Sequence, residues 1–397
     1  MKTNQIWKIY GTDYKEMTKA LLDAADLKGC IYEKARRKFG SSAEEETMHG
    51  IAVGIKPNLV TASPAEFGAT THPEIVAGIV EYLQENRFSN LLIAEGSWVG
   101  DRTEEAFRYC GYNELSVKYQ VPLVDTQKES SHSVNCSGLK LQITDVADRI
   151  DFLINVPVMK GHCQTKVTCA LKNMKGLLPN AEKSRFHRMG LMKPIAHLNT
   201  GIHQDFIVVD HICGDLDFEE GGNPVIRNCI MAAADPVLTD SYVCRLMQYS
   251  TDEVPYIGMA EDLGVGSSDL EEAEILLLEK GEGPGDAYKI RSLGIYEDED
   301  KEEVRKKVLD VSYAVDEVDS CSACYGNLIG ALVRLEEEGL LKKLDTQIGI
   351  GQGFRGKGGV LGIGECTSQF THCIRGCPPD EDSIYDGLRA FIMEENR

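Results

Sequence analysis

The chain lacks any apolar run near the roughly 20 residues that a bilayer-spanning helix needs. Its opening residues, MKTNQIWKIYGTDYKEM, contain no apolar stretch of the kind found in signal peptides. Positive charge is also scarce, because 42 Lys and Arg stand against 63 Asp and Glu, for a formal net charge of −21. Such a negative field repels nucleic acid and anionic membranes. We therefore expect a cytoplasmic protein with neither nucleic acid nor membrane among its partners.

Three common catalytic motifs are also missing. The patterns HExxH, GxSxG and GxxxxGK[ST] do not occur, so zinc-protease, α/β-hydrolase and P-loop functions have no direct support. The segment from Gly351 to Gly356 reads GxGxxG, but the dinucleotide fingerprint needs a helix directly afterwards, and here a Gly-rich apolar run follows. We interpret this segment as flexible backbone that bends tightly or approaches a metal centre closely.

Cysteine, in contrast, is abundant and unevenly placed. Five of the thirteen cysteines lie in the last fifth of the chain: Cys321, Cys324, Cys366, Cys373 and Cys377. A CxxC pair places two sulfurs within reach of one metal, and the later cysteines can supply the other ligands. Thiolates in this number suit an iron–sulfur cluster or zinc rather than magnesium or calcium. Two prolines directly follow the last cysteine, and proline stiffens a ligand-bearing turn.

Other uses of these cysteines are less well supported. A disulfide framework needs an oxidising compartment and usually a small domain, whereas this chain has 397 residues and an odd cysteine count. A thioredoxin-type CxxC would leave three neighbouring cysteines unexplained. We predict a [4Fe–4S] cluster held by Cys321, Cys324, Cys366 and Cys377, with Cys373 as an alternative ligand and Zn²⁺ as an alternative metal. Most other cysteines are expected to be small buried apolar residues: Cys30, Cys110, Cys136, Cys169, Cys213, Cys229 and Cys244.

Short β-rich runs alternate with helical stretches along the first two thirds of the chain. The runs cover 51–55, 91–94, 121–124, 152–156, 206–209 and 225–232, and two of the helical stretches cover 73–86 and 103–110. This alternation favours an α/β fold, with a mostly parallel sheet and helices on both faces. We expect an α/β domain over 1–260, an acidic connecting subdomain over 261–319, and a cysteine-rich metal-binding region over 320–397 that returns to the α/β body.

Polar residues follow five of these runs. Each is individually explained by a chain turning to solvent, but ligands of open α/β sheets bind outside the carboxyl ends of the strands. We therefore predict that the set lines a site. Its members are Lys56, Asn58, Glu95, Asp125, Lys160, His162 and Asp210.

A cationic segment, KGHCQTKVTCALKNMKGLL over 160–178, stands out in this acidic chain. We predict a helix over 163–176 whose polar face carries Thr165, Thr168, Lys172 and Lys175. The plain alternative is a solvated helix face. We favour a crevice that binds the phosphate or carboxylate of a small anionic ligand. Four residues downstream could form a lid over it: Arg185, His187, Arg188 and Lys193.

Three further residues have a structural and a functional interpretation. His72 stands where THPE indicates the start of a helix, and it could instead reach the crevice. Asp235 is expected to cap the helix that begins at the following proline. Asp240 is either directed at the site or a charge on the face of that helix.

Several segments together resemble the family of proteins with domain of unknown function 362 (DUF362). They are KPNLV, TTHPEIVAGIV, KGHCQTKVTCALKNMKGLL and ADPVLTDSYVCRLM, in this order, and GECTSQFTHCIRGCPP resembles the cysteine-bearing ending of many members. The resemblance implies the α/β fold and the cluster, since members are generally uncharacterised and sometimes described as iron–sulfur proteins. Cys373 is an addition to the expected ending.

These observations predict an iron–sulfur protein with a redox role, as an enzyme of the oxidoreductase class or as an electron carrier. The cluster would pass single electrons, and the crevice would hold a small anionic ligand. Its partner would be that ligand or an electron-transfer protein. Two alternatives stay open: a non-redox protein with a structural metal, and an accessory protein that assembles or supplies clusters.

Overall fold

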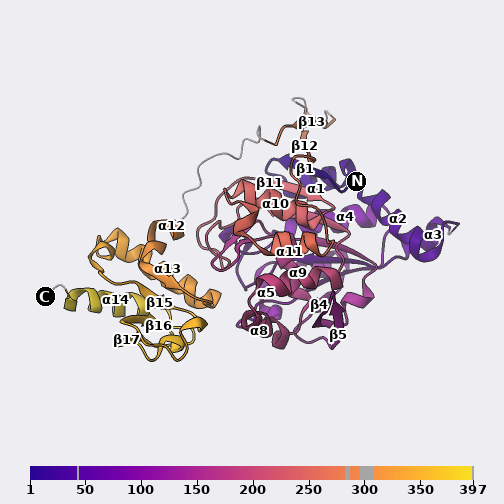
Figure 1. Cartoon of the computed structure of the whole chain (residues 1–397). Helices are drawn as coiled ribbons and strands as arrows, with labels where there is room; N and C mark the ends of the chain where they lie inside the picture. The colour runs from indigo at the N-terminus through magenta and orange to yellow at the C-terminus, as the bar shows by residue number, and fades with distance from the viewer. Residues whose placement is uncertain (43, 282–286, 296–306, 396–397) are drawn as a thin grey trace. The chain divides into compact units, whose positions relative to one another are not determined.

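The structure is a computed structural model that describes residues 1–42, 44–281, 287–295 and 307–395 (Figure 1). It comprises two compact units. The first unit is Met1–Gly161 with Val167–Glu302, and the second is His162–Lys166 with Glu303–Arg397. None of the helices in the described part of the chain combines the length and the apolarity that crossing a bilayer requires.

A nine-stranded, mostly parallel sheet forms the centre of the first unit, in the order β13-β12-β1-β11-β10-β7-β2-β3-β4. The five strands from β10 to β4 run parallel, whereas β11 is antiparallel to both of its neighbours. The strands are β1 (Gln5–Tyr10), β2 (Val53–Pro57), β3 (Leu91–Glu95), β4 (Leu123–Asp125), β7 (Phe152–Val156), β10 (Phe206–His211), β11 (Cys229–Ala233), β12 (Glu274–Glu279) and β13 (Lys289–Leu293).

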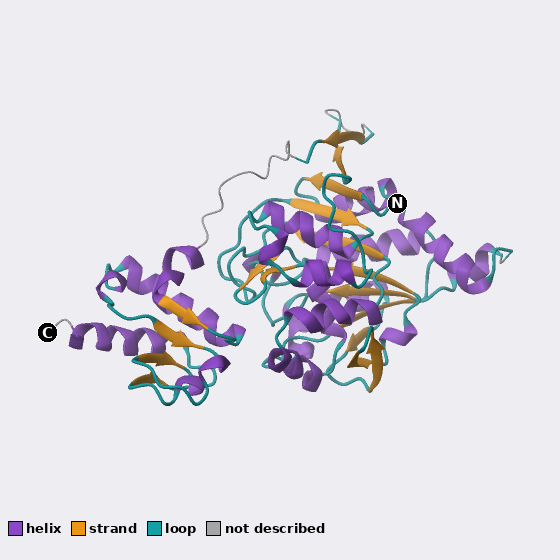
Figure 2. Cartoon of the chain, viewed as in Figure 1, coloured by secondary structure: helices purple, strands orange, loops and turns teal. Residues whose placement is uncertain are grey.

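Helices cover both faces of this sheet (Figure 2), which confirms the predicted α/β class. One face packs against α1 (Tyr14–Ala24), α2 (Leu27–Phe39), α4 (Pro73–Glu85), α5 (Thr103–Tyr109) and α6 (Tyr112–Tyr119), and its core contains buried residues such as Ile55, Ile93 and Ile79. The other face carries α7 (Ala170–Asn173), α8 (Asn180–Met189), α9 (Met192–Gly201), α10 (Pro236–Leu246) and α11 (Tyr256–Asp262). Both faces of the central strands are therefore apolar and buried.

The strand order reverses beside β2. The chain proceeds from β2 to β3 and β4 on one side, and then returns to place β7 and β10 on the other side. In open α/β sheets this reversal leaves a crevice at the carboxyl ends of the two strands concerned. Lys56 and Asn155 are neighbours in the register of β2 and β7 at this point.

Two smaller pairs of strands accompany the large sheet. β5 (Ser131–Cys136) and β6 (Leu139–Thr144) form an antiparallel hairpin, and β8 (Lys160–His162) pairs with β9 (Lys166–Thr168). The helix predicted over 163–176 is therefore wrong, because it starts only at Ala170 and continues as a 3₁₀ turn over Met174–Leu177. Lys166 has a φ of +61°, which a right-handed helix cannot contain, and the β-branched residues around it favour strands.

The described part of the predicted acidic connection over 261–319 is divided between the two units, with α12 (Lys307–Val311) and β14 (Val315–Glu317) in the second unit. Its strands β12 and β13 belong to the large sheet, where β12 pairs parallel to β1. The acidic residues 282–286 and 296–306 lie outside the described residues.

The second unit has its own parallel sheet, β14 (Val315–Glu317), β15 (Ile348–Ile350), β16 (Leu361–Ile363) and β17 (His372–Ile374). It also contains α12 (Lys307–Val311), α13 (Ser322–Glu337) and α14 (Glu381–Glu395), and α13 packs on α14 through buried residues such as Leu332 and Leu388. The GxGxxG segment forms only a 3₁₀ turn over Gln352–Phe354. Gly351 has a φ of +119°, and a Cβ there would lie 2.0 Å from the Val318 carbonyl. Gly351 therefore allows a tight bend of the chain that a residue with a side chain could not form.

Candidate functional site

A buried ion pair lies at the reversal of the strand order. The Lys56 ammonium donates to the Glu95 carboxylate, to the Pro57 carbonyl at 2.7 Å and to Asn173 Oδ1 at 3.2 Å. The side chains of Lys56 and Glu95 are 1% and 3% exposed. Burial lowers the pKa of Lys56, and the charge of Glu95 opposes that shift. The structure therefore brings two of the predicted strand-end residues into direct contact.

Asn58 and Lys160 continue this polar network. Asn58 Nδ2 donates to Asn173 Oδ1 at 2.9 Å, and the Lys160 ammonium donates to Asn58 Oδ1 at 3.2 Å. Lys160 also donates to the Ala69 and Glu219 carbonyls, at 2.6 and 2.8 Å. Burial lowers the pKa of Lys160 to about 8. An ammonium with this pKa can release its proton near neutral pH.

Lys172 lies next to Lys160 but has an acidic partner. Its ammonium is 2.5 Å from Glu219 Oε1 and 3.0 Å from Thr168 Oγ1, and its side chain is 2% exposed. Glu219 thus contributes its carboxylate to one lysine and its carbonyl to the other. The chain's own carboxylate occupies the place where the sequence predicted a carboxylate or phosphate of a ligand.

The four residues predicted as a lid belong to α8 and α9. Arg185 is engaged within its own helix, because it donates to both oxygens of Glu182, at 2.6 and 2.9 Å, and to the Lys140 carbonyl. Lys183, which the sequence did not single out, is the residue of α8 that reaches the strand ends. Its buried ammonium donates to the carbonyls of Gly96 and Ser97, and burial lowers its pKa to about 8.

His72 and Asp210 form a second buried pair. His72 is the N-cap residue of α4, and its Nδ1 lies 2.8 Å from Asp210 Oδ2, which also accepts the backbone N–H of His72. Burial lowers the pKa of His72, but the charge and hydrogen bond of Asp210 outweigh it and raise the pKa to about 11. His72 therefore carries a proton at neutral pH.

The remaining predicted residues have local partners or peripheral positions. His162 Nδ1 accepts the backbone N–H groups of Gln164 and Thr165, at 3.0 and 3.1 Å. Lys175 is half-buried on the 3₁₀ turn after α7. Asp125 accepts the backbone N–H of Gln127 at 2.9 Å. None of these contacts involves the lysine network around Lys56.

Asp235 and Asp240 each accept hydrogen bonds at the N-terminus of a helix. Asp235 accepts the N–H groups of Val237 and Leu238, which confirms the predicted cap. Asp240 accepts those of Ala170 and Leu171, at 2.7 and 3.2 Å, and thereby fixes the start of α7. Burial raises the pKa of Asp240 to about 7.

In the second unit, four cysteines converge. Burial and, after it, the charges of Cys321, Cys377 and Cys366 raise the pKa of Cys324 to about 12. The pKa of Cys321 is raised by burial and then by Cys366 and Cys377. Arg355 Nε donates to Cys366 Sγ at 3.5 Å, and Gln352 donates to Cys321 Sγ at 3.6 Å. These thiols are therefore close enough to interact electrostatically, and a cation lies beside them.

Cys373 has different neighbours. Its sulfur lies 3.5 Å from both the Thr367 hydroxyl and the Gly364 carbonyl. It is not among the main causes of the raised pKa values of Cys321 and Cys324. Gly364 also borders the other thiols, since a Cβ at this position, whose φ is +84°, would lie 3.8 Å from Cys324 Sγ.

Sequence reasoning missed three members of the network, Asn155, Asn173 and Glu219. Asn155 Oδ1 accepts from Asn173 Nδ2 at 2.6 Å, and Asn173 joins Lys56 to Asn58. A signal for Asn155 was present, because an amide inside the apolar run FLINV needs buried partners. Glu219 gave no such signal, since it stands in an acidic, Gly-containing loop.

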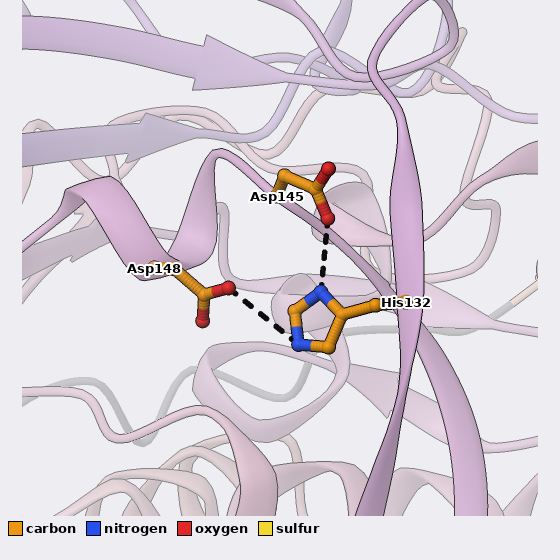
Figure 3. A group of neighbouring side chains, drawn as sticks. All are labelled: His132, Asp145 and Asp148. Carbon is orange, nitrogen blue, oxygen red and sulfur yellow. Dashed lines mark hydrogen bonds and ion pairs between the residues drawn. The ribbon is translucent and has the colours of Figure 1, made fainter.

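One exposed group has the composition of a metal site. His132, Asp145 and Asp148 point toward one another (Figure 3), with His132 Nδ1 2.9 Å from Asp145 and Nε2 3.5 Å from Asp148. Each ring nitrogen of His132 thus faces one carboxylate, and the three residues form exposed ion pairs. Hydrogen bonding to Asp145 raises the pKa of His132. Exposed acidic groups of this kind are common without a metal.

A cavity of about 110 Å³ lies at the end of the sheet where β10 begins, opposite the carboxyl ends of the parallel strands. Its lining includes Gln204, which precedes β10, and Ala234, which follows the antiparallel β11. The lysine network lies at the carboxyl ends of the parallel strands and does not line this cavity.

Comparison with known proteins identifies one domain. Residues 53–245 match the family described as domain of unknown function (DUF362), which confirms the resemblance seen in the sequence motifs. A thylakoid-associated protein of Synechocystis sp. is 26% identical over 232 residues, covering 54% of this chain and 69% of that protein. The lactate racemase apoprotein from Thermoanaerobacterium thermosaccharolyticum is 14% identical, with a TM-score of 0.32, over 56% of this chain and 53% of that structure.

Proposed function

We propose, given that residues 53–245 match the DUF362 family, that this chain is an iron–sulfur protein with a role in electron transfer. The observation that carries the proposal is the convergence of four thiols in the second unit. Cys321, Cys324, Cys366 and Cys377 would hold a [4Fe–4S] cluster, and Cys373 would not be a ligand. A bound cluster of this type supplies one-electron transfer.

The spacing of the thiols supports a cluster over zinc. Four sulfurs around one Zn²⁺ lie about 3.8 Å from one another, given a Zn–S distance of about 2.3 Å. Within the described residues, one group of three or more His, Cys, Asp or Glu side chains has ligand atoms that all lie within 4.8 Å of one another. This group is His132, Asp145 and Asp148, and it contains no cysteine. A cluster is larger than a single ion and spaces its cysteines farther apart, which fits four thiols of which no three lie within 4.8 Å of one another.

Two polar side chains would adjust the charge of this centre. The Arg355 guanidinium and the Gln352 amide donate to Cys366 and Cys321, respectively. Donors to the sulfur ligands favour the more negative, reduced form of such a centre. This arrangement supports a redox role more than a purely structural one.

Purification without oxygen tests the proposal directly. We expect a brown protein whose visible absorption bleaches on reduction with dithionite and returns on oxidation, with about four iron atoms and four sulfides per chain. Cys321→Ser and Cys377→Ser should lose the cluster, whereas the matched control Cys373→Ser should retain it. A colourless preparation with stoichiometric zinc would contradict the assignment, and equal loss in all three variants would contradict the choice of ligands.

An accessory role in cluster assembly is the second candidate, favoured by one observation. Cys377 is exposed, whereas the other three thiols are partly buried. An exposed ligand eases transfer of a cluster to an acceptor. Transfer from the loaded protein to an apo-ferredoxin, followed by its absorption spectrum, separates this role from electron transfer.

We also propose that the lysines of the first unit bind the carboxylate or phosphate of a small ligand. Glu219 supports this ligand class, because the chain itself places a carboxylate against Lys172 and a carbonyl against Lys160. A ligand would take the place of the Glu219 side chain. Glu219→Gln should therefore bind inorganic phosphate or citrate more tightly in calorimetry, and Lys172→Ala more weakly. Unchanged affinity in both variants would remove these lysines from the site.

A further inference from the structure

Cys213, His72 and Asp210 lie in a row at the carboxyl end of β10. Cys213 Sγ is 3.7 Å from His72 Nε2, and His72 Nδ1 is 2.8 Å from Asp210 Oδ2. One ring nitrogen thus faces a thiol and the other a carboxylate. This is the relation of nucleophile, base and orienting group that activates cysteine for covalent catalysis.

The backbone fixes all three side chains. Asp210 is part of β10, Cys213 follows in the next loop, and His72 begins α4. The two oxygens of Asp210 accept the backbone N–H groups of His72 and Ile212, at 2.8 and 3.1 Å. His72 and Cys213 are 5% and 6% exposed. The imidazole is therefore held in one orientation between the carboxylate and the thiol.

The Cys213 sulfur has a cationic side chain as its neighbour. The protonated state of His72 at neutral pH follows from its Asp210 partner, and a nearby imidazolium stabilises the anionic form of a cysteine. The half-buried Tyr14 packs edge-on against His72, with ring centroids 5.6 Å apart. The negative charges of Cys213 and Asp210 contribute, after burial, to a raised pKa of this tyrosine.

We propose that Cys213, His72 and Asp210 form a nucleophilic site that accepts an acyl group from an ester or thioester. The Cys213 thiolate attacks the carbonyl carbon, a sulfur–carbon bond forms, and the bond to the leaving oxygen or sulfur breaks as His72 gives that atom its proton. Water then attacks the acyl carbon, His72 takes up a proton from it, and Cys213 leaves as a thiolate. The site lies in the first unit and is independent of the proposed cluster.

Cys110 provides a matched control in the same unit. It is 4% exposed, and its sulfur contacts the Ser63 carbonyl at 3.1 Å and the Thr70 hydroxyl at 3.8 Å. The Cys213 sulfur likewise lies 3.4 Å from a carbonyl oxygen, that of Ala65. Burial raises the pKa of Cys110 to about 11. Two cysteines of similar burial therefore differ in whether a histidine is their neighbour.

Acetylation of the full chain, purified without oxygen, tests the proposal. The protein is mixed with p-nitrophenyl acetate, release of p-nitrophenolate is followed, and the acetylated peptides are identified by mass spectrometry. We expect Cys213 to be acetylated roughly 100-fold faster than Cys110, and His72→Gln to slow this step by about 100-fold. Cys213→Ala should abolish the rapid initial release of p-nitrophenolate that accompanies acetylation, and Cys110→Ala should preserve it.

The rate of alkylation by iodoacetamide tests whether Asp210 acts through His72 on the thiol. At neutral pH the rate at Cys213 should exceed the rate at Cys110 in the natural chain, and Asp210→Asn should bring it down toward the rate at Cys110. Equal rates at Cys213 and Cys110, no acetyl group on Cys213, or an unchanged rate in His72→Gln would each overturn the proposal. Circular dichroism checks that each variant is folded, and the comparison of the two thiols in the natural chain needs no variant.

Discussion

The Lys56 ammonium donates to the Glu95 carboxylate where β2 and β3 end side by side. Both side chains are almost completely buried, and Asn173 supplies a further acceptor for the lysine. A buried ion pair of this kind has lost the solvation of two charges, and only its geometry and hydrogen bonds compensate for that loss. The pair therefore joins the ends of two strands, and the stability of the fold depends strongly on the presence of both partners.

Removing one member of this pair should destabilise the first unit strongly. Lys56→Met leaves the Glu95 carboxylate buried without its cation, and such changes cost about 3–5 kcal/mol. The double variant Lys56→Met with Glu95→Leu removes both charges and should recover much of this loss. Urea denaturation of the natural chain and the three variants measures the coupling. Additive losses in the double variant would contradict the ion pair.

Gly176 tests how closely the backbone approaches the same pair. A Cβ at this position would lie 2.2 Å from Glu95 Oε1 and 2.5 Å from Lys56 Nζ. Neither group can move away freely, because each is buried and bonded to the other. We expect Gly176→Ala to lower the free energy of unfolding by about 1–3 kcal/mol. Gly258→Ala is a suitable control, since no heavy atom lies within 4 Å of its Cβ position. Equal stability of the two variants would contradict this packing.

Local sequence patterns were sufficient for the elements around this site. The apolar run FLINV predicted β7 at 152–156, which is where it lies, and the proline after His72 marked the start of α4. Both patterns depend on neighbouring residues, through β-propensity and through the fixed φ of proline. Polar residues after successive strands also predicted that Lys56 and Glu95 lie close together, because parallel strands end together.

Contacts between distant residues could not be predicted in the same way. The bond between Lys172 and Glu219 joins residues 47 positions apart, and that between Lys56 and Asn173 spans 117. The hairpin of β8 and β9 depends on the left-handed conformation of Lys166, which no pattern in KGHCQTKVTC indicates. Amphipathic spacing therefore suggested a helix where the chain forms strands. The sequence predicts Cys213 only as a small buried apolar residue, and no local pattern indicates the contact with His72, which lies 141 positions away.

The His72–Asp210 pair should make stability depend on pH in the alkaline range. The pKa of His72 is raised to about 11 in the folded chain, against about 6.5 for an unperturbed histidine. The folded state therefore keeps a proton that the unfolded state releases above about pH 6.5. The contribution of the pair is complete below that pH, falls as the pH rises, and is lost by about pH 11.

Urea denaturation of the natural chain and of His72→Gln at several pH values measures this contribution. The difference in free energy of unfolding between the two proteins should be largest near about pH 6 and should shrink toward about pH 10. His132→Gln is the matched control, because that histidine pairs with Asp145 on an exposed surface. A difference that grows with pH would show that His72 is neutral in the folded protein.

Arg355 offers a test of the redox role through charge. Its guanidinium donates to Cys366. The hydrogen bond and charge of Cys366 raise the pKa of Arg355 most, and the charges of Cys321 and Cys377 contribute less. A cation beside the cysteines would stabilise the reduced form of a cluster, which carries one more negative charge. Arg355→Ala should therefore lower the reduction potential, measured by redox titration of the visible absorption, while Arg355→Lys should largely keep it. The iron content of both variants should equal that of the natural protein, so that a shift in potential is separated from loss of the cluster. A potential that stays unchanged in Arg355→Ala would mean that this arginine does not influence the proposed centre.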